Sequence, residues 1–183
     1  MDPFETLLDI ERNCKAYAVN IPRKIVTKRD WFGIGFRSSN FNFVCPIKEV
    51  IEILRGSANS EVPGAYPWFR GVSNLRGHLL PVTDLEGFIT GVVHPENGLS
   101  RILVVSFENA LYGFVVSQLL GIERFFGKEL KSAEKIPEIK QYLPFVQGTF
   151  EQDRKPWVIL SFRSLIKTPE FYHVVKGEWQ ADV

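Results

Sequence analysis

From Gly33 onward, the chain is a succession of short apolar runs separated by turn residues. The first two runs, Gly33 to Arg37 and Phe41 to Cys45, are joined by the turn-forming residues Ser38-Ser39-Asn40. Similar runs, many rich in Val, Ile and Phe, recur at His78 to Val82, Arg101 to Phe107, Tyr112 to Val116, Phe145 to Phe150 and Trp157 to Leu160. Short runs of this composition between turns are typical of β-strands. The pattern predicts a mainly all-β fold built as barrels or a sandwich.

The connections between the runs favour antiparallel neighbours. Glu108 to Leu111 is a short link between two runs, which is typical of a hairpin. Two short helices are predicted at Leu85 to Phe88 and at Phe162 to Ile166. Asp84 and Ser161 precede them, and both side chains can accept hydrogen bonds from the free amides of a helix N-terminus. With so few helices, a parallel α/β architecture is disfavoured.

The N-terminal segment differs from the rest of the chain. Residues 2–18 predict one helix, because Asp2 can cap it and Pro3 suits its first turn. Residues 22–30 have no apolar periodicity and are interpreted as a linker. The helix is therefore expected to be an appendage to the main fold.

These patterns divide the chain into three parts: an N-terminal helical extension and linker at residues 1–30, a main domain at 31–168 and a C-terminal tail at 169–183. The tail carries apolar side chains that include Phe171, Val175 and Trp179. Such a segment is too apolar for a disordered terminus, so part of it is expected to pack.

Charge and cysteine content limit the classes of partner. The 183 residues carry 22 basic and 21 acidic side chains, so the chain lacks the positive field that holds nucleic acid or an anionic membrane. Cys14 and Cys45 form no C-x-x-C pair and are expected to be reduced, buried thiols. The N-terminus is acidic, and no apolar run approaches the roughly 20 residues of a membrane span. A cytoplasmic protein without direct membrane insertion is expected.

No constellation of catalytic, cofactor-binding or metal-binding residues stands out. The three histidines lie far apart in the sequence, without metal-ligand spacing. Gly71 and Gly77 do not form a phosphate-binding or dinucleotide-binding loop. Asp84 and Glu86 could be an acid and base pair, but a helix cap explains Asp84 more simply. The residues predict no enzyme, no cofactor and no metal site.

The aromatic content leaves one alternative function open. The chain has 15 Phe, 5 Tyr and 4 Trp, and aromatic side chains on a small β-barrel can stack on the bases of single-stranded nucleic acid. Most of these aromatics lie inside apolar runs, without interleaved Arg and Lys, which favours core packing. A small nucleic-acid-binding barrel is therefore the second hypothesis.

Residues 71–85 carry the most specific motif. Their sequence, G-V-S-N-L-R-G-H-L-L-P-V-T-D-L, matches all ten specified positions of the CheW family signature G-V-x-N-L-R-G-x-x-x-P-V-x-D-L. Val50 to Ile53 resembles the V-x-E-I end of an early strand in that family. Ser117 and Ser161 stand where the family usually has Asp, and both keep a side chain that can cap a short helix. The resemblance covers residues 33–168, and the N-terminal extension is most similar to the PilI-type branch.

This resemblance implies a fold and a function. The fold would be two adjacent five-stranded SH3-like barrels joined through a shared hydrophobic layer. The function would be that of a non-catalytic adaptor between a CheA-type histidine kinase regulatory domain and the cytoplasmic tip of a methyl-accepting chemoreceptor, in type IV pilus twitching motility. Glu52 and Arg76 are expected to pair at the receptor-facing surface or, alternatively, to be an ordinary surface ion pair. The expected protein-binding residues are Glu52, Arg76, Val50, Asn74 and Leu75.

Overall fold

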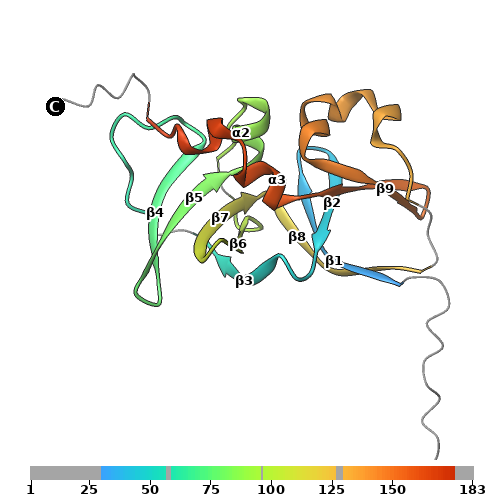
Figure 1. Cartoon of the computed structure of the whole chain (residues 1–183), viewed down its shortest axis with the longest axis horizontal. Helices are drawn as coiled ribbons and strands as arrows, with labels where there is room; N and C mark the ends of the chain where they lie inside the picture. The colour runs from blue at the N-terminus through green and yellow to red at the C-terminus, as the bar shows by residue number, and fades with distance from the viewer. Residues whose placement is uncertain (1–29, 57–58, 96, 127–129, 176–183) are drawn as a thin grey trace, which may run out of the picture.

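The computed structural model describes residues 30–56, 59–95, 97–126 and 130–175 (Figure 1). The helix predicted over residues 2–18 and the thiol of Cys14 lie outside these ranges. Within them, the chain is built mainly from short strands. The strands are β1 (Trp31–Ser38), β2 (Phe41–Pro46), β3 (Val50–Arg55), β4 (Phe69–Leu75), β5 (His78–Asp84), β6 (Arg101–Phe107), β7 (Ala110–Val116), β8 (Gln118–Phe125), β9 (Val146–Gln152) and β10 (Lys155–Leu160). The helical elements are α2 (Leu85–Thr90), α3 (Phe162–Ile166) and the 3-10 segments η1 (Ala133–Lys135), η2 (Pro137–Phe145) and η3 (Pro169–Tyr172).

The strands form two five-stranded sheets with the same pairing pattern. The first sheet has the order β8-β1-β2-β10-β9, and the second has the order β3-β6-β7-β5-β4. The second sheet is built entirely from the chain between β2 and β8, so it is an insertion into the first. Figure 1 shows the two sheets side by side. The all-β prediction is confirmed.

One parallel pair in each sheet departs from the antiparallel expectation. β10 lies parallel to β2, and β5 lies parallel to β7, while all the other pairs are antiparallel. Hairpin patterns report only on strands that are neighbours in the sequence. The whole second sheet separates β2 from β10, and a connection of that length places no limit on strand direction.

Each sheet curls around a small apolar core of its own. All five strands of the second sheet contribute to one cluster, whose members are Leu54, Leu75, Leu80, Val82, Ile102, Val104, Leu111 and Val115. All five strands of the first sheet contribute to another, whose members are Trp31, Val44, Leu120, Phe125, Phe150, Trp157 and Ile159. Among the described residues, the edge strands β3 and β4 do not pair with each other. The sheets are therefore SH3-like barrels that stay open at one seam.

A third apolar cluster joins the two barrels. The first barrel contributes side chains such as Phe36 and Phe43, the second contributes Leu103 and Phe114, and α3 contributes Phe162. Six side chains in or next to the predicted apolar runs are at most 2% exposed: Val82, Leu85, Leu103, Val105, Phe114 and Val116. The shared hydrophobic layer implied by the family resemblance is present.

Both predicted helix caps are confirmed. The Asp84 carboxylate accepts a hydrogen bond from the Gly87 amide at 2.9 Å, and the Ser161 hydroxyl accepts one from the Ser164 amide at 3.2 Å. Ser117 caps no helix, because β8 begins at the next residue. The capping expectation for Ser117 is therefore wrong, since the chain continues there into a strand.

Cys45 is a fully buried free thiol, as the sequence predicted. Burial raises the pKa of this thiol well above its usual range, and the nearby Glu49 carboxylate raises the pKa further. Because the thiolate is the reactive form of cysteine, Cys45 is a packing residue rather than a nucleophile.

Candidate functional site

Glu52 and Arg76 meet at the open seam of the second barrel. Glu52 lies on β3, and Arg76 lies in the turn between β4 and β5, at the other end of the sheet order. The curl of the barrel brings them together, with the Arg76 Nη2 atom 2.9 Å from the Glu52 Oε1 atom. The predicted pairing is confirmed. The Arg76 side chain is 78% exposed and that of Glu52 is 28% exposed, so the guanidinium keeps donors free for a partner.

The N-L-R-G sequence explains how Arg76 reaches this position. Arg76 and Gly77 both have positive φ, at 52° and 87°, which is the geometry of a two-residue type I′ hairpin turn. The Asn74 side-chain oxygen accepts a hydrogen bond from the Gly77 amide at 2.8 Å and so holds the turn closed. The turn projects the Arg76 side chain across the seam toward β3.

The other predicted docking residues differ in burial: Asn74 is exposed, whereas Leu75 and Val50 are half-buried. Leu75 is half-buried against the core of the second barrel. Val50 is half-buried against the layer that joins the barrels, and a β-bulge separates it from Glu52. The structure therefore gathers Asn74 and Leu75 around the Arg76 turn and places Val50 on the strand of Glu52. Their part in docking stays a prediction.

Sequence reasoning missed several exposed apolar side chains on the same elements. Ile51 and Ile53 are exposed on β3, and Leu79 is exposed on β5, just after the Arg76 turn. Exposed apolar side chains can mark a site of contact with another protein. Two signals could have revealed them: the Val, Ile and Leu residues on both sides of Glu52, and the two consecutive leucines after His78.

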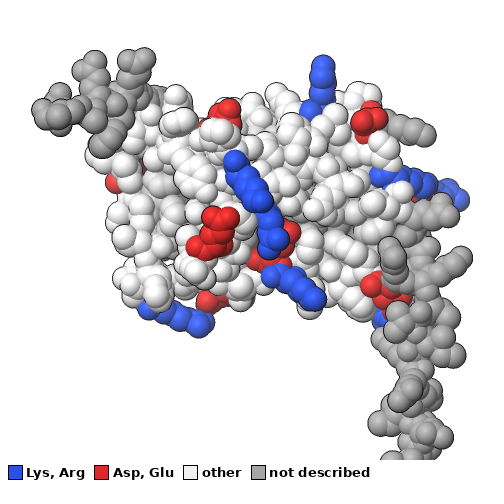
Figure 2. Space-filling model, viewed as in Figure 1, with Lys and Arg blue, Asp and Glu red and all other residues white. Residues whose placement is uncertain are grey.

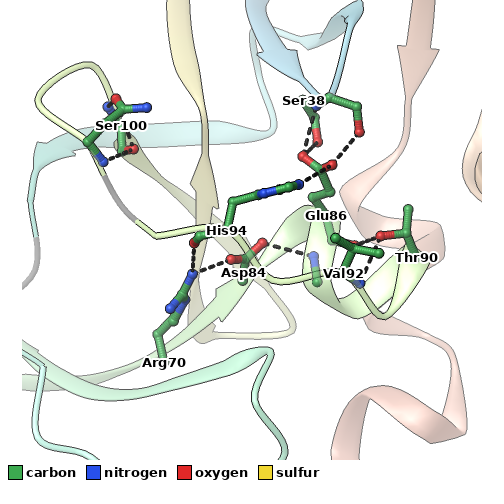
Figure 3. Close-up of polar contacts among 11 residues, drawn as sticks. Ser38, Arg70, Asp84, Glu86, Thr90, Val92, His94 and Ser100 are labelled. Atoms are coloured by element: carbon green, nitrogen blue, oxygen red, sulfur yellow. Dashed lines mark hydrogen bonds and ion pairs between the residues drawn. The ribbon is translucent and has the colours of Figure 1, made fainter.

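A second polar cluster lies where the two barrels meet, around Glu86 of α2 (Figure 3). The Glu86 side chain accepts hydrogen bonds from the Ser39 hydroxyl and, at 2.8 Å, from the Ser39 amide. The Ser38 hydroxyl donates to Glu86 at 3.5 Å, and the His94 Nε2 atom lies 3.3 Å from the carboxylate. Glu86 thus ties the β1–β2 turn of the first barrel to α2 of the second.

Asp84 has different partners from Glu86. Its Oδ2 atom pairs with the Arg70 guanidinium at 2.6 Å, while Oδ1 caps α2. The same Arg70 nitrogen donates to the His94 carbonyl. The crevice beside the two carboxylates has a volume of about 50 Å³, room for little more than water. Each carboxylate therefore has a structural role: Asp84 caps α2 and Glu86 bonds across the two barrels.

Two further findings concern the described ranges only. Within them, no three His, Cys, Asp or Glu side chains gather in a way that could hold a metal ion. In the same part of the chain, no helix has the length and apolar character needed to cross a bilayer.

Figure 2 shows charges of both signs on one face of the molecule. Lys and Arg side chains are interspersed with Asp and Glu, some of them in contact near the centre of the view, and most of this face is uncharged. No continuous basic stripe crosses the described part of this face.

Comparisons with known proteins agree with this geometry. The family model for the CheW-like domain matches residues 33–170. The chain is 34% identical over 173 residues to protein PilI of Pseudomonas aeruginosa, covering 94% of this chain and 96% of PilI. It is 25% identical over 100 residues to the chemotaxis protein CheW of Bacillus subtilis, covering 55% of this chain and 64% of that protein. The crystal structure of the scaffolding protein TtCheW from Thermoanaerobacter tengcongensis superposes with a TM-score of 0.67 at 20% identity, covering 78% and 92% of the two chains. The chain belongs to the family of proteins with a CheW-like domain.

Proposed function

We propose that this protein is a non-catalytic adaptor in a chemosensory array that controls type IV pilus twitching motility. It would act in the cytoplasm, where it couples the tip of a methyl-accepting chemoreceptor to the regulatory domain of a CheA-type histidine kinase. The observation that carries the proposal is the 34% identity to PilI along almost the whole of both chains.

The architecture supports a coupling role on physical grounds. A coupling protein needs two surfaces at a constant separation, and the shared apolar layer holds the two barrels together as one packed unit. It also needs exposed apolar and charged groups for its partners, which Ile51, Leu79 and Arg76 provide on the second barrel.

The test is a binding experiment with three purified components. The full chain is titrated with the kinase regulatory domain, with a receptor tip fragment, and with both together. We expect both binary complexes and one ternary complex. Binding to neither partner, or competition between them for one surface, would refute the adaptor function. Single-stranded oligonucleotides serve as a further ligand, and micromolar binding that weakens steeply with added salt would favour the nucleic-acid hypothesis instead.

A further inference from the structure

A groove with aromatic walls lies where α2, η2 and η3 meet the chain between β3 and β4. Its volume is about 460 Å³, within the range of ligand-binding pockets. Figure 1 shows α2 and the β4–β5 turn that carries Arg76 at opposite ends of the second barrel, so the groove lies away from the Glu52–Arg76 pair. The adaptor function proposed above assigns no role to it. Its aromatic lining residues are Tyr66, Trp68, Phe88 and Phe145.

The aromatic rings present surface on more than one side of the groove. The Trp68 and Phe88 rings meet nearly at right angles, with an interplanar angle of 82° and centroids 5.0 Å apart. The centroids of the Phe88 and Phe145 rings are 6.5 Å apart, and their planes are inclined at 47°. All three side chains are half-buried, so part of each stays accessible. The face of an aromatic ring carries partial negative charge and attracts a cation within about 6 Å of its centroid.

The polar lining of the groove supplies hydrogen-bond acceptors and a negative charge. Glu170 is exposed, and among the described residues no ion pair involves its carboxylate. The Thr168 hydroxyl donates to the Leu165 carbonyl at 2.6 Å, so its oxygen is left to accept. Gln141, with a further acceptor oxygen, and His173 complete this lining, and none of the described lining residues is lysine or arginine. A ligand with a positive charge and several N–H donors would complement this set.

The first barrel contains a complete example of the same chemistry. The Arg124 guanidinium of β8 lies 3.6 Å from the centroid of the Phe126 ring and 5.0 Å from that of Phe32, and its Nη2 atom lies 2.8 Å from the Asp30 carboxylate. Aromatic rings and one carboxylate thus hold a single guanidinium between them.

The groove has two of these three components. Its aromatic walls and the Glu170 carboxylate are present. Within the described part of the chain, however, the cations that lie over aromatic rings belong to other places, and none of them covers Trp68, Phe88 or Phe145. By comparison with Arg124, the missing component is a guanidinium.

We propose that this groove binds the guanidinium of an arginine side chain that a partner protein presents. Arginine fits better than lysine, because its planar guanidinium stacks on an aromatic ring while its fork of N–H donors pairs with a carboxylate. Glu170 accepts two of the five N–H donors, and the oxygens of Thr168 and Gln141 accept others. A side chain of another protein also fits better than free arginine, whose own carboxylate would be repelled by Glu170.

The test follows the indole N–H resonance of Trp68 by NMR in the full chain, where it is assigned by its loss in Trp68→Phe. The probe is a tripeptide with blocked ends and arginine between two glycines. In a matched peptide, citrulline replaces arginine, which keeps the length and the planar end group but removes the charge. We expect the arginine peptide to shift the resonance saturably at millimolar concentrations and the citrulline peptide to bind at least about fivefold more weakly. A lysine peptide should bind with an affinity between the two.

A variant of the groove tests the carboxylate. We expect Glu170→Gln to weaken binding of the arginine peptide by about threefold or more, because it removes the negative charge and keeps the shape of the side chain. The matched control is Asp153→Asn, which makes the same change from carboxylate to amide at an exposed residue in the β9–β10 turn of the first barrel. It should leave binding unchanged.

Several results would overturn the proposal. A Trp68 resonance that the arginine peptide does not move is one, and equal binding of the citrulline peptide or equal binding by Glu170→Gln is another. Tighter binding of free arginine than of the peptide would assign the groove to a small molecule. A Trp68 resonance that moves with protein concentration alone would assign it to a second copy of the chain. None of these measurements needs the kinase or the receptor, so the result stands apart from the binding test of the adaptor function.

Discussion

Arg76 occupies a left-handed backbone position in a tight turn, and its guanidinium both pairs with Glu52 and faces solvent. An exposed ion pair contributes only about 0.2 to 1 kcal/mol to stability. The ion pair by itself therefore adds little to the stability of the fold. That Arg76 contacts a partner stays a prediction.

We expect Arg76→Glu to fold normally and to lose affinity for the receptor tip by more than about tenfold, equivalent to roughly 1.4 kcal/mol. The reversed charge repels Glu52 and removes the planar donor fork, which lysine could not replace. Kinase binding should fall less. Isothermal titration with each partner, together with a melting curve, measures these effects.

Two variants make the Arg76 test specific. Arg154→Glu makes the same change at another positive-φ residue, in the β9–β10 turn of the other barrel, and should leave receptor binding unchanged. The double variant Glu52→Arg with Arg76→Glu restores the ion pair with its two charges exchanged between the positions. If the double variant recovers full receptor binding, the partner does not recognise Arg76 itself and the docking role is wrong.

Glu49 predicts a pH dependence of stability. Burial raises the pKa of its carboxyl above the ordinary value of 4.5. Two groups partly lower this pKa again: the Phe162 amide, which donates a hydrogen bond to the carboxylate at 3.2 Å, and the positive charge of Arg163. Because the folded-state pKa is raised, the stabilisation from protonated Glu49 is present below pH 4.5 and is lost as the pH rises through the folded-state value. We expect Glu49→Gln, which stays neutral and can still accept the Phe162 hydrogen bond, to be more stable than the native chain at pH 7 and equally stable at low pH. Urea unfolding across this range measures it, and a difference that does not change with pH would contradict the assignment.

At the scale of elements, the two short helices depend on their caps. α2 has six residues and α3 has five, which is too short for a helix to persist without tertiary support. Each follows the second strand of a hairpin and begins at a side chain that accepts from the third helical amide. The caps therefore decide where strand becomes helix in both barrels.

We expect Ser161→Ala to lower the free energy of unfolding by about 1 to 2 kcal/mol, because Ser161 is buried and its loss leaves the Ser164 amide without its acceptor. Ser164→Ala is the control within the same helix. It removes a hydroxyl but keeps the backbone hydrogen bond, so its cost should be clearly smaller. Equal losses in denaturant titrations would show that the Ser161 cap has no particular role.

At the scale of the molecule, a shared apolar layer joins the two barrels, and we expect them to unfold as one cooperative unit. Phe114 of β7 is fully buried and stacks on Phe162 of α3 at 4.6 Å, and Phe162 in turn stacks on Phe36 of β1 at 5.8 Å. Aromatic contacts therefore run without interruption from one barrel to the other. The proposed adaptor function would gain from this, since a rigid link would keep two partner surfaces at a constant separation.

We expect Phe114→Ala to lower the free energy of unfolding by about 3 to 5 kcal/mol, because it leaves a cavity in the shared layer. Hydrogen exchange should become faster in β1 and β2 as well as in β6 and β7. Phe125→Ala, at a fully buried position inside the first barrel only, tests whether any large cavity has this effect. Faster exchange confined to the second barrel in Phe114→Ala would mean that the barrels unfold independently.

Local chemistry made much of this molecule predictable from its sequence. The Ser39-Asn40 turn and the caps at Asp84 and Ser161 each depend on side chains and backbone groups within four residues of one another. These features need no knowledge of the rest of the chain. The apolar runs predicted β6 and β7 themselves, but both strands are buried on two faces, so Ile102, Val104 and Val115 are buried in addition to Leu103, Val105, Phe114 and Val116. The pairing of Glu52 with Arg76 came from the family motif, since no local rule joins two residues 24 positions apart.

Only the tertiary structure decided the features that depend on how the sheets curl and meet. The parallel pairing of β2 with β10, and the contact of Glu86 with Ser39 across 47 positions, join segments whose separation in sequence leaves their relative direction open. Ser117 also could not be assigned from its local sequence. A serine caps α3 at Ser161, but at Ser117 the chain continues into the strand β8. The physical reason is that long-range contacts are selected by the total area buried in the shared layer, which is a property of the assembled barrels and of no single segment.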